Sequence, residues 1–367
     1  MSAVPADAAV DAVTARACTV PTDAPESDGT LEWDATTIVV VTVTAEGVTG
    51  LGYTYCDAAA ARLVDGLLAD VLRGRDALDV GGAWAAMWQA IRNLGQSGIA
   101  AMAVSALDIA LWDLKARLLG VPLVVALDAT HEAVPAYGSG GFCSYSDHRL
   151  GHQLSGWAES GFRAVKIKVG RRPDLDEHRV RVARQAIGPD VALYVDANGA
   201  LTRGEARRWA QLYARRDVRW FEEPVSSDDV DGLRAVRDAT TGGVEIAAGE
   251  YGWALPHFRH LLDAGAVDCL QADVTRCGGI TGFRRVAALA DAYGVDLSAH
   301  CAPQVSAHAA CSVWHPRHVE WFHDHVRIER LLFDGCLDPV AGRLTPDRER
   351  PGHGLALDEV AAERWAA

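Results

Sequence analysis

Four short apolar runs decide the fold of this 367-residue chain: AVKIKV at 164–169, ALYVD at 192–196, WFEE at 220–223 and EIAAGE at 245–250. Each run reads as a short strand, and a charged side chain lies at or near its end. Polar segments with the apolar spacing of amphipathic helices separate the runs. Short strands that alternate with amphipathic helices are typical of an α/β protein with a parallel sheet.

The same alternation continues on both sides of these runs. We expect further strands at 134–137, 269–272, 295–298 and 319–321. Helices are predicted at 174–187, 203–215, 230–238, 256–264 and 282–293. A count near eight strands favours a closed (β/α) barrel of the TIM type. A doubly wound open sheet is the competing architecture, but no G-x-G-x-x-G motif follows any of these strands.

The N-terminal third has a different pattern. The β-branched run at 36–44 and the segment 50–55 predict a hairpin, and helices are expected at 60–72, 82–94 and 98–119. Gly120 and Pro122 end the last of these helices. The first 130 or so residues therefore form an α+β unit ahead of the barrel.

Composition excludes several classes of protein. The chain is 49% apolar and 23% charged, as in ordinary globular proteins, and its net charge is −14. This charge repels nucleic acid and anionic lipid, so we expect neither as a partner. The N-terminus lacks a basic flank followed by an apolar stretch, so we expect a cytoplasmic protein. Eight scattered cysteines without a C-x-x-C pair are expected to be reduced thiols.

Seven of the eight predicted barrel strands end at or near a charged residue. These residues follow one another at intervals of 20 to 28 positions, which is one strand, helix and loop pair. In a barrel all of them gather at the C-terminal face, where such enzymes place their active sites. The series comprises Lys168, Asp196, Glu222, Glu250, Asp273, His300 and Glu320.

Three carboxylates, Asp196, Glu222 and Glu250, lie at the ends of consecutive strands. They would repel one another strongly unless a cation lay between them. Oxygen ligands without a nearby Cys or His suit Mg²⁺ better than Zn²⁺. Glu223 is expected to point away from this site because side chains alternate along a strand.

Two acid/base candidates flank the predicted metal site. Lys166 and Lys168 lie two residues apart and face one side of a strand, and mutual repulsion is expected to lower the pKa of each. Asp273 and His300 end consecutive strands, and a hydrogen bond between them would orient the imidazole. The four histidines between 315 and 325 lack the spacing of a metal site.

The motifs KIK, VDANG, FEEP, AAGE, QADVTRCGGIT and SAH occur in this order, and ALDIALWDL at 106–114 precedes them. Together they resemble the enolase superfamily, mandelate racemase subgroup. The resemblance implies an α+β capping domain at 1–130, a (β/α)7β barrel at 131–330 and a segment at 331–367 that returns to the cap. It also implies Mg²⁺ at Asp196, Glu222 and Glu250.

The resemblance further implies a role for each remaining site residue. Lys168 would be one base, modulated by Lys166, and Asp273 with His300 would form the opposing dyad. Asn198 would contact a substrate oxygen. Glu320 would donate a hydrogen bond to the substrate carboxylate as it becomes an enediolate. The strand at 269–274 lacks the lysine that muconate cycloisomerases and dipeptide epimerases would place there.

The expected reaction is loss of the α-proton of a hydroxy carboxylate. The segment 21–33 is expected to be a specificity loop, and its polar side chains favour an acid sugar. Dehydration of such a substrate would give a 2-keto-3-deoxy acid. A racemase or epimerase of 2-hydroxy acids is the alternative on the same scaffold. Two alternatives belong to other functional classes. One is a Schiff-base aldolase that uses Lys168 covalently, and the other is a catalytically silent binding protein. We expect a homo-oligomer with a small carboxylate as its substrate.

Overall fold

The structure is a computed structural model that describes residues 8–367; residues 1–7, at the start of the predicted cap, lie outside it. Eight parallel strands form a closed barrel in the order β11-β10-β9-β8-β7-β6-β5-β4, because β11 also pairs with β4. This confirms the predicted barrel. The strands are β4 (Val134–Gly140), β5 (Ala164–Lys168), β6 (Ala192–Asp196), β7 (Val218–Glu222), β8 (Glu245–Ala248), β9 (Cys269–Ala272), β10 (Asp296–Ala299) and β11 (Pro316–Phe322).

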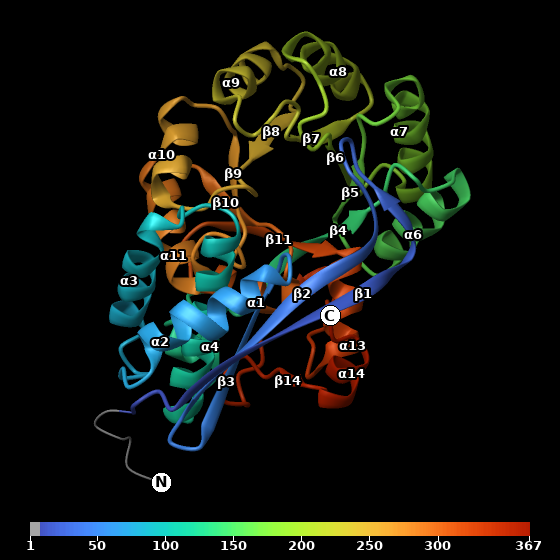
Figure 1. Cartoon of the computed structure of the whole chain (residues 1–367). Coiled ribbons are helices and arrows are strands. Elements are labelled where there is room, and N and C mark those ends of the chain that lie inside the picture. The colour runs from blue at the N-terminus through green and yellow to red at the C-terminus, as the bar shows by residue number, and fades with distance from the viewer. Residues whose placement is uncertain (1–7) are drawn as a thin grey trace.

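Helices follow the strands and form an outer ring around the barrel (Figure 1). They are α6 (Asp147–Glu159), α7 (Pro173–Ile187), α8 (Arg203–Arg215), α9 (Val230–Ala239), α10 (Leu255–Asp263), α11 (Gly279–Ala292), α12 (Pro303–Cys311) and α13 (His323–Leu332). A capping box of Thr202 and Glu205 begins α8. Neither α6 nor α12 was predicted. All nine residues of α12 are buried, so this helix has no polar face to reveal its period.

The N-terminal unit is a three-stranded antiparallel sheet covered by helices. Its strands are β1 (Ala12–Ser27), β2 (Glu32–Ala45) and β3 (Val48–Tyr55). The helices are α1 (Ala59–Leu63), the π-helical turn η1 (Val64–Leu68), α2 (Ala69–Leu72), α3 (Val80–Ala90), the 3₁₀ turn η2 (Ile91–Asn93), α4 (Ile99–Leu118) and α5 (Leu123–Ala126). The single helix predicted at 60–72 is thus interrupted, at Gly66, whose ψ of −106° is not helical.

Helix α4 lies between the sheet and the barrel. Gly52 lets β3 approach it closely, since a Cβ there would lie 2.1 Å from the backbone oxygen of Ala106. On its other side, Ser105 Oγ accepts a hydrogen bond from Gly278 N (2.9 Å), and Asp108 Oδ2 accepts one from Thr281 N (2.9 Å). These contacts attach the cap to the start of α11. No helix among the described residues is long and apolar enough to span a membrane.

The β1–β2 hairpin extends from the cap to the C-terminal end of the barrel (Figure 1). Ser27 O accepts a hydrogen bond from Cys143 N (2.7 Å), and Glu32 forms an ion pair with Arg171. The segment 21–33, read in the sequence as a loop, is therefore mainly the tip of a hairpin. This places its polar side chains beside the ends of β4 and β5.

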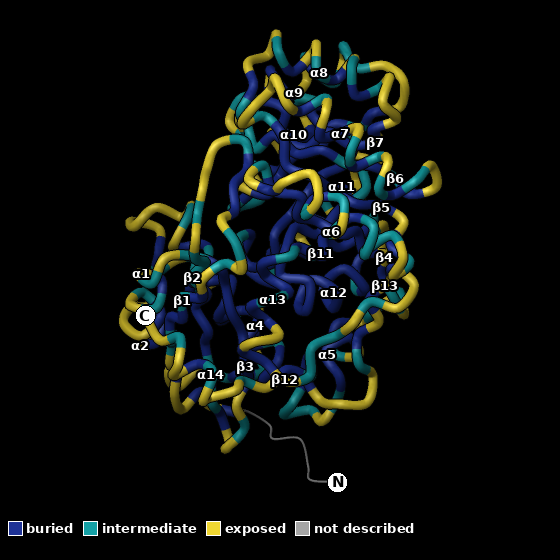
Figure 2. The backbone as a smooth tube through the Cα atoms, turned by 90° about the vertical axis from the view of Figure 1, so that its right-hand side faces the viewer, coloured by how far each residue is buried: buried dark blue, intermediate teal, exposed yellow. Residues whose placement is uncertain are grey.

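The last part of the chain packs against both units. It contains β12 (Phe333–Asp334), β13 (Arg343–Leu344), β14 (Ala356–Leu357) and α14 (Glu359–Arg364). Strand β13 pairs with β4, and Trp365 O accepts a hydrogen bond from Thr19 N of β1 (2.8 Å). Figure 2 shows the result, a buried interior beneath exposed loops.

Candidate active site

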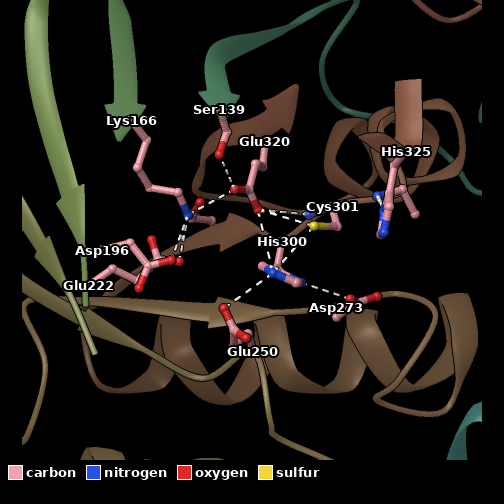
Figure 3. A network of polar contacts seen from close by, with 12 residues as sticks. Ser139, Lys166, Asp196, Glu222, Glu250, Asp273, His300, Cys301, Glu320 and His325 are labelled. Atoms are coloured by element: carbon pink, nitrogen blue, oxygen red, sulfur yellow. Dashed lines mark hydrogen bonds and ion pairs between the residues drawn. The ribbon is translucent and has the colours of Figure 1, made fainter. Parts of the chain in front are cut away.

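The strand-end residues converge at one end of the barrel (Figure 3). The register pairs Lys168 with Asp196 and Asp196 with Glu222, so these three side chains lie at one level. The whole predicted series is buried, with exposed fractions between 0 and 5%. The strands are otherwise apolar, so these charged side chains lie in the interior of the barrel. Opposite charges partly compensate one another there.

Asp196, Glu222 and Glu250 form a compact carboxylate cluster. Each offers an oxygen within 4.8 Å of the others. Burial raises the pKa of Glu222 to about 7 despite the ammonium group of Lys166 2.6 Å away. This cost of ionisation and the set of oxygen donors both fit a hard divalent cation such as Mg²⁺.

The cluster belongs to a larger set of buried charges with a surplus of negative groups. Six carboxylates outnumber four cations in this set. The six are Asp196, Glu222, Glu223, Glu250, Asp273 and Glu320, and the four are Lys166, Lys168, His300 and the partly buried Arg276. A bound divalent cation reduces this imbalance.

The prediction that the pKa values of Lys166 and Lys168 are lowered is wrong, because neighbouring carboxylates raise both. Burial lowers the pKa of Lys168, and Lys166 lowers it further, but nearby carboxylates, Asp196 first, leave it raised. Lys168 Nζ lies 2.5 Å from Asp196 Oδ2. Lys166 is likewise raised, because Glu222 and Glu320 outweigh its burial. The carboxylates are closer to each ammonium than the sequence pattern alone indicates.

Asp273 and His300 form the expected pair. His300 Nδ1 lies 2.8 Å from Asp273 Oδ2, and Asp273 Oδ1 accepts hydrogen bonds from Thr275 N and Oγ1, both 2.7 Å. Burial lowers the pKa of His300, but the neighbouring Cys301, Glu250 and other acidic groups leave it raised. The imidazole is therefore held in its charged form, with Nε2 directed towards Glu250 Oε2 (3.2 Å).

Glu320 is an acceptor in this arrangement. Its Oε1 accepts a hydrogen bond from Ser139 Oγ (2.6 Å) and lies 2.8 Å from Lys166 Nζ, while Oε2 accepts one from Cys301 N (3.1 Å). Burial opposes ionisation, but Lys166 and His300 hold the pKa of Glu320 well below its ordinary value. The donor role implied by the resemblance thus requires uptake of a proton.

Asn198 and Glu223, which follow β6 and β7, have left-handed backbone conformations. Asn198 has φ of 45°, its N–H donates to Asp196 Oδ1 (2.8 Å), and its buried side-chain oxygen has no partner. Glu223 has φ of 36° and is buried, and after burial itself the charge of Glu250 is the main cause of its raised pKa. The expectation that Glu223 points away from the site is wrong, because strand alternation ends at Glu222.

The site opens into a pocket with a volume of about 400 Å³ between barrel and cap. Lys168, Asn198, Glu250, His300, Cys301 and Glu320 line it from the barrel. The remaining lining includes residues that sequence reasoning missed, namely Tyr55, Cys56, Asp57, Tyr251, Arg276, Asp324 and His325. Arg276 lies in the QADVTRCGGIT motif, so the sequence contains a signal for it. Tyr55, Cys56 and Asp57 carry no such signal, because they reach the pocket only through the packing of the cap against the barrel.

The histidines between 315 and 325 have separate partners. His315 pairs with Asp291, His318 with Ser298 Oγ, and His323 with Asp23. His325 stacks on Tyr55 with ring centroids 3.4 Å apart. Each of these four contacts joins two different segments of the fold, so we assign them to packing.

Known families match both parts of the chain. Residues 12–127 match the N-terminal domain of mandelate racemase / muconate lactonizing enzyme, and residues 149–361 match the enolase C-terminal domain-like family. The 3,6-anhydro-alpha-L-galactonate cycloisomerase of Streptomyces coelicolor is 38% identical over 86% of this chain and 87% of its own. The L-talarate/galactarate dehydratase of Salmonella typhimurium is 31% identical over 87% of this chain and 80% of its own.

Solved structures agree with this assignment. A mandelate racemase/muconate lactonizing enzyme-like protein from Rubrobacter xylanophilus is 57% identical, with a TM-score of 0.96 over 98% of this chain and 100% of its own. A racemase from Streptomyces coelicolor with bound magnesium is 34% identical, with a TM-score of 0.91 over the same shares. The chain therefore belongs to the mandelate racemase / muconate lactonizing enzyme family of the enolase superfamily, whose members are Mg²⁺-dependent lyases and isomerases.

Proposed function

We propose that this enzyme dehydrates an acid sugar to a 2-keto-3-deoxy acid. The observation that carries the proposal is that a lysine and a carboxylate-bound histidine, Lys168 and His300, line one pocket from different sides. Lys168 is the last residue of β5 and His300 directly follows β10, and these strands are separated by β4 and β11 along the shorter arc of the barrel. A base and an acid so placed can act on two bonds of one substrate.

The metal ligands in this proposal are Asp196, Glu222 and Glu250. Bound Mg²⁺ supplies positive charge that makes the α-proton of a substrate carboxylate more acidic. The unpartnered side-chain oxygen of Asn198 accepts a hydrogen bond from a substrate hydroxyl in the same pocket. These contacts orient the α-carbon between the two acid/base groups.

Lys168 takes the α-proton in the proposed reaction. It must first lose its own proton, and a cation held by Asp196 would reduce the carboxylate charge that now raises the pKa of Lys168. Lys166 then acts in the direction expected from the sequence, because its ammonium group disfavours a second positive charge nearby. Glu320 gains a proton more readily once a substrate carboxylate lies beside it, and it can then donate a hydrogen bond to the enediolate.

His300 completes the elimination. Its raised pKa supplies a proton at Nε2, and Asp273 keeps the ring oriented through Nδ1. The proton goes to the C3 oxygen as the C3–O bond breaks, water leaves, and the resulting enol becomes the 2-keto product. The balance is one substrate to one keto acid and one water, with no oxidant or reductant.

The pocket lining favours a substrate with several hydroxyl groups. On the cap side and at the start of α13 it includes Asp28, Thr36, Thr37, Asp57 and Asp324. Such carboxylates and hydroxyls can accept hydrogen bonds from a polyol. An acid sugar meets this lining better than an aryl hydroxy acid does.

Ring-opening isomerisation is a second candidate, favoured by the relative named a 3,6-anhydro-galactonate cycloisomerase. In a 3,6-anhydro acid the C3 oxygen belongs to an ether ring. The same elimination then opens the ring, and the leaving oxygen remains attached to the molecule. The product is an isomer of the substrate, whereas dehydration lowers the mass by one water.

A substrate panel separates these reactions. Purified enzyme with Mg²⁺ is incubated with aldonic, aldaric and 3,6-anhydro acids in deuterated water, and 2-keto products are trapped with semicarbazide. A keto product lighter by one water supports dehydration, and one of unchanged elemental composition supports ring opening. Exchange or inversion at the α-carbon without any keto product would overturn both proposals in favour of the racemase.

A further inference from the structure

A second group of metal-ligating atoms lies beside the carboxylate cluster. It consists of His300 and Cys301, which follow β10, and Glu320 on the neighbouring strand β11 (Figure 3). The three residues are 5, 3 and 0% exposed. An imidazole nitrogen, a thiol sulfur and a carboxylate oxygen are the donors that Zn²⁺ prefers in proteins.

Each donor atom of this group can still bind a common ligand. Ser139 and Lys166 contact Oε1 of Glu320, whereas Oε2 accepts one hydrogen bond, from Cys301 N (3.1 Å), and keeps a second lone pair. Asp273 occupies Nδ1 of His300, and Nε2 faces Glu250 Oε2 (3.2 Å), a contact that a bound ion would replace once the imidazole loses its proton. A carboxylate on the distal nitrogen is the usual outer partner of a histidine that binds zinc.

The distances fit a tetrahedral ion. Cys301 Sγ lies 3.3 Å from His300 Nε2 and 3.4 Å from Glu320 Oε2, and Nε2 and Oε2 are 3.6 Å apart. In a tetrahedral zinc site with ordinary bond lengths, neighbouring ligand atoms are about 3.4–3.6 Å apart. The three atoms thus already form one face of such a tetrahedron.

Both the charge around this group and its access to the pocket allow a second cation to bind. Loss of the His300 and Cys301 protons raises the surplus of negative groups in this interior from two to four, which matches the charge of two divalent ions. All three residues line the pocket, so an ion can enter and water can fill the fourth position. Cys301 is held towards the site by its left-handed backbone (φ 48°) and by the hydrogen bond from its N–H to Glu320.

We propose that His300, Cys301 and Glu320 form a binding site for a zinc-like divalent cation, separate from the Mg²⁺ site. Binding displaces the thiol proton of Cys301 and the Nε2 proton of His300 to solvent, and the thiolate and Nε2 then bind the ion. An enzyme in this state cannot deliver a proton from His300, so the ion is an inhibitor of the elimination. The binding itself does not depend on which acid is the substrate.

Cobalt provides a direct readout, because a Co²⁺–thiolate bond absorbs in the near ultraviolet and oxygen ligands do not produce this band. Protein saturated with Mg²⁺ is titrated with Co²⁺, and Zn²⁺ binding is measured by equilibrium dialysis. The wild type is expected to show the band and to bind one Zn²⁺ per chain more than Cys301→Ala. Cys56→Ala is the matched control, because Cys56 lines the same pocket away from His300.

A second measurement uses only the wild-type protein, so its result does not depend on whether Cys301→Ala folds. Zn²⁺ is expected to slow alkylation of Cys301, read by peptide mass spectrometry, and to leave the alkylation of Cys56 unchanged. The proposal is overturned if Mg²⁺-saturated wild type shows no thiolate band, if Cys301→Ala retains the band, or if Zn²⁺ leaves Cys301 as reactive as before.

Discussion

The Nδ1 atom of His300 lies 2.8 Å from Oδ2 of Asp273, so the only ring nitrogen of His300 that faces the pocket is Nε2. Asp273 is itself fixed by Thr275, which donates two hydrogen bonds to its other oxygen. The dyad is therefore oriented before any substrate binds. This rigidity is what a directed proton transfer requires.

Asp273→Asn is expected to lower the rate of keto-acid formation by about 10²- to 10⁴-fold. The amide can no longer stabilise the protonated imidazole, while Lys168 is untouched. Exchange of the α-proton catalysed by Lys168 should therefore persist when measured by NMR in deuterated water. Asp296→Asn, at the opposite end of β10 and paired with Arg317, is the matched control and should keep near-normal turnover. Equal losses of exchange and elimination in Asp273→Asn would contradict this division of labour.

Lys168→Ala is expected to abolish α-proton exchange and to lower turnover by about 10²- to 10⁴-fold. Borohydride treatment of wild type with substrate should give no covalent adduct, because the lysine acts as a base. Intact-protein mass spectrometry provides the readout. A substrate adduct on Lys168 would instead support the Schiff-base aldolase reading.

Excess chelator is expected to stop turnover reversibly, with recovery on addition of Mg²⁺. Glu222→Gln should lose activity because one ligand charge is removed, and should keep a thermal midpoint near that of wild type. Glu245→Gln, at the start of β8 and paired with Arg317, is the control outside the site. Undiminished activity in excess chelator would show that the carboxylate cluster does not serve a metal.

The contact between cap and barrel is expected to weaken as pH rises. Burial raises the pKa of Asp108 to about 7 from an ordinary value of 3.8, so the folded state favours the protonated form. The free energy of unfolding contributed by this group is fully present below about pH 4 and is lost as pH rises to 7. Asp108→Asn should remove this part of the pH dependence, which urea unfolding between pH 5 and 8 would measure. An unchanged pH slope in the variant would contradict the assignment.

The barrel and most of its site were predictable because each strand is a short apolar run that ends in a polar residue. Lys168, Asp196 and Glu222 stand out against such runs, and the structure places them side by side. Strand β1 was missed because its first half mixes alanine, threonine and arginine without a continuous apolar run. Its place in the sheet is set by pairing with β2.

The parts of the site that could not be predicted depend on contacts between distant segments. Tyr55 reaches the pocket only because β3 of the cap lies against α13, where it stacks on His325. The pKa direction of Lys168 was mispredicted because the sequence gives no distance to Asp196. Glu223 was misplaced because a left-handed residue after a strand ends its alternation.

The central claim is that Lys168 and His300 carry out a β-elimination on an acid sugar. The most direct measurement is product analysis by mass spectrometry after reaction of the Mg²⁺-saturated enzyme with a panel of α-deuterated acid sugars. The account predicts a 2-keto-3-deoxy acid that has lost the deuterium and one water, formed at a greatly reduced rate by Lys168→Ala and by His300→Asn. Deuterium loss with the substrate skeleton and all its hydroxyl groups intact, and no keto acid from any member of the panel, would contradict it.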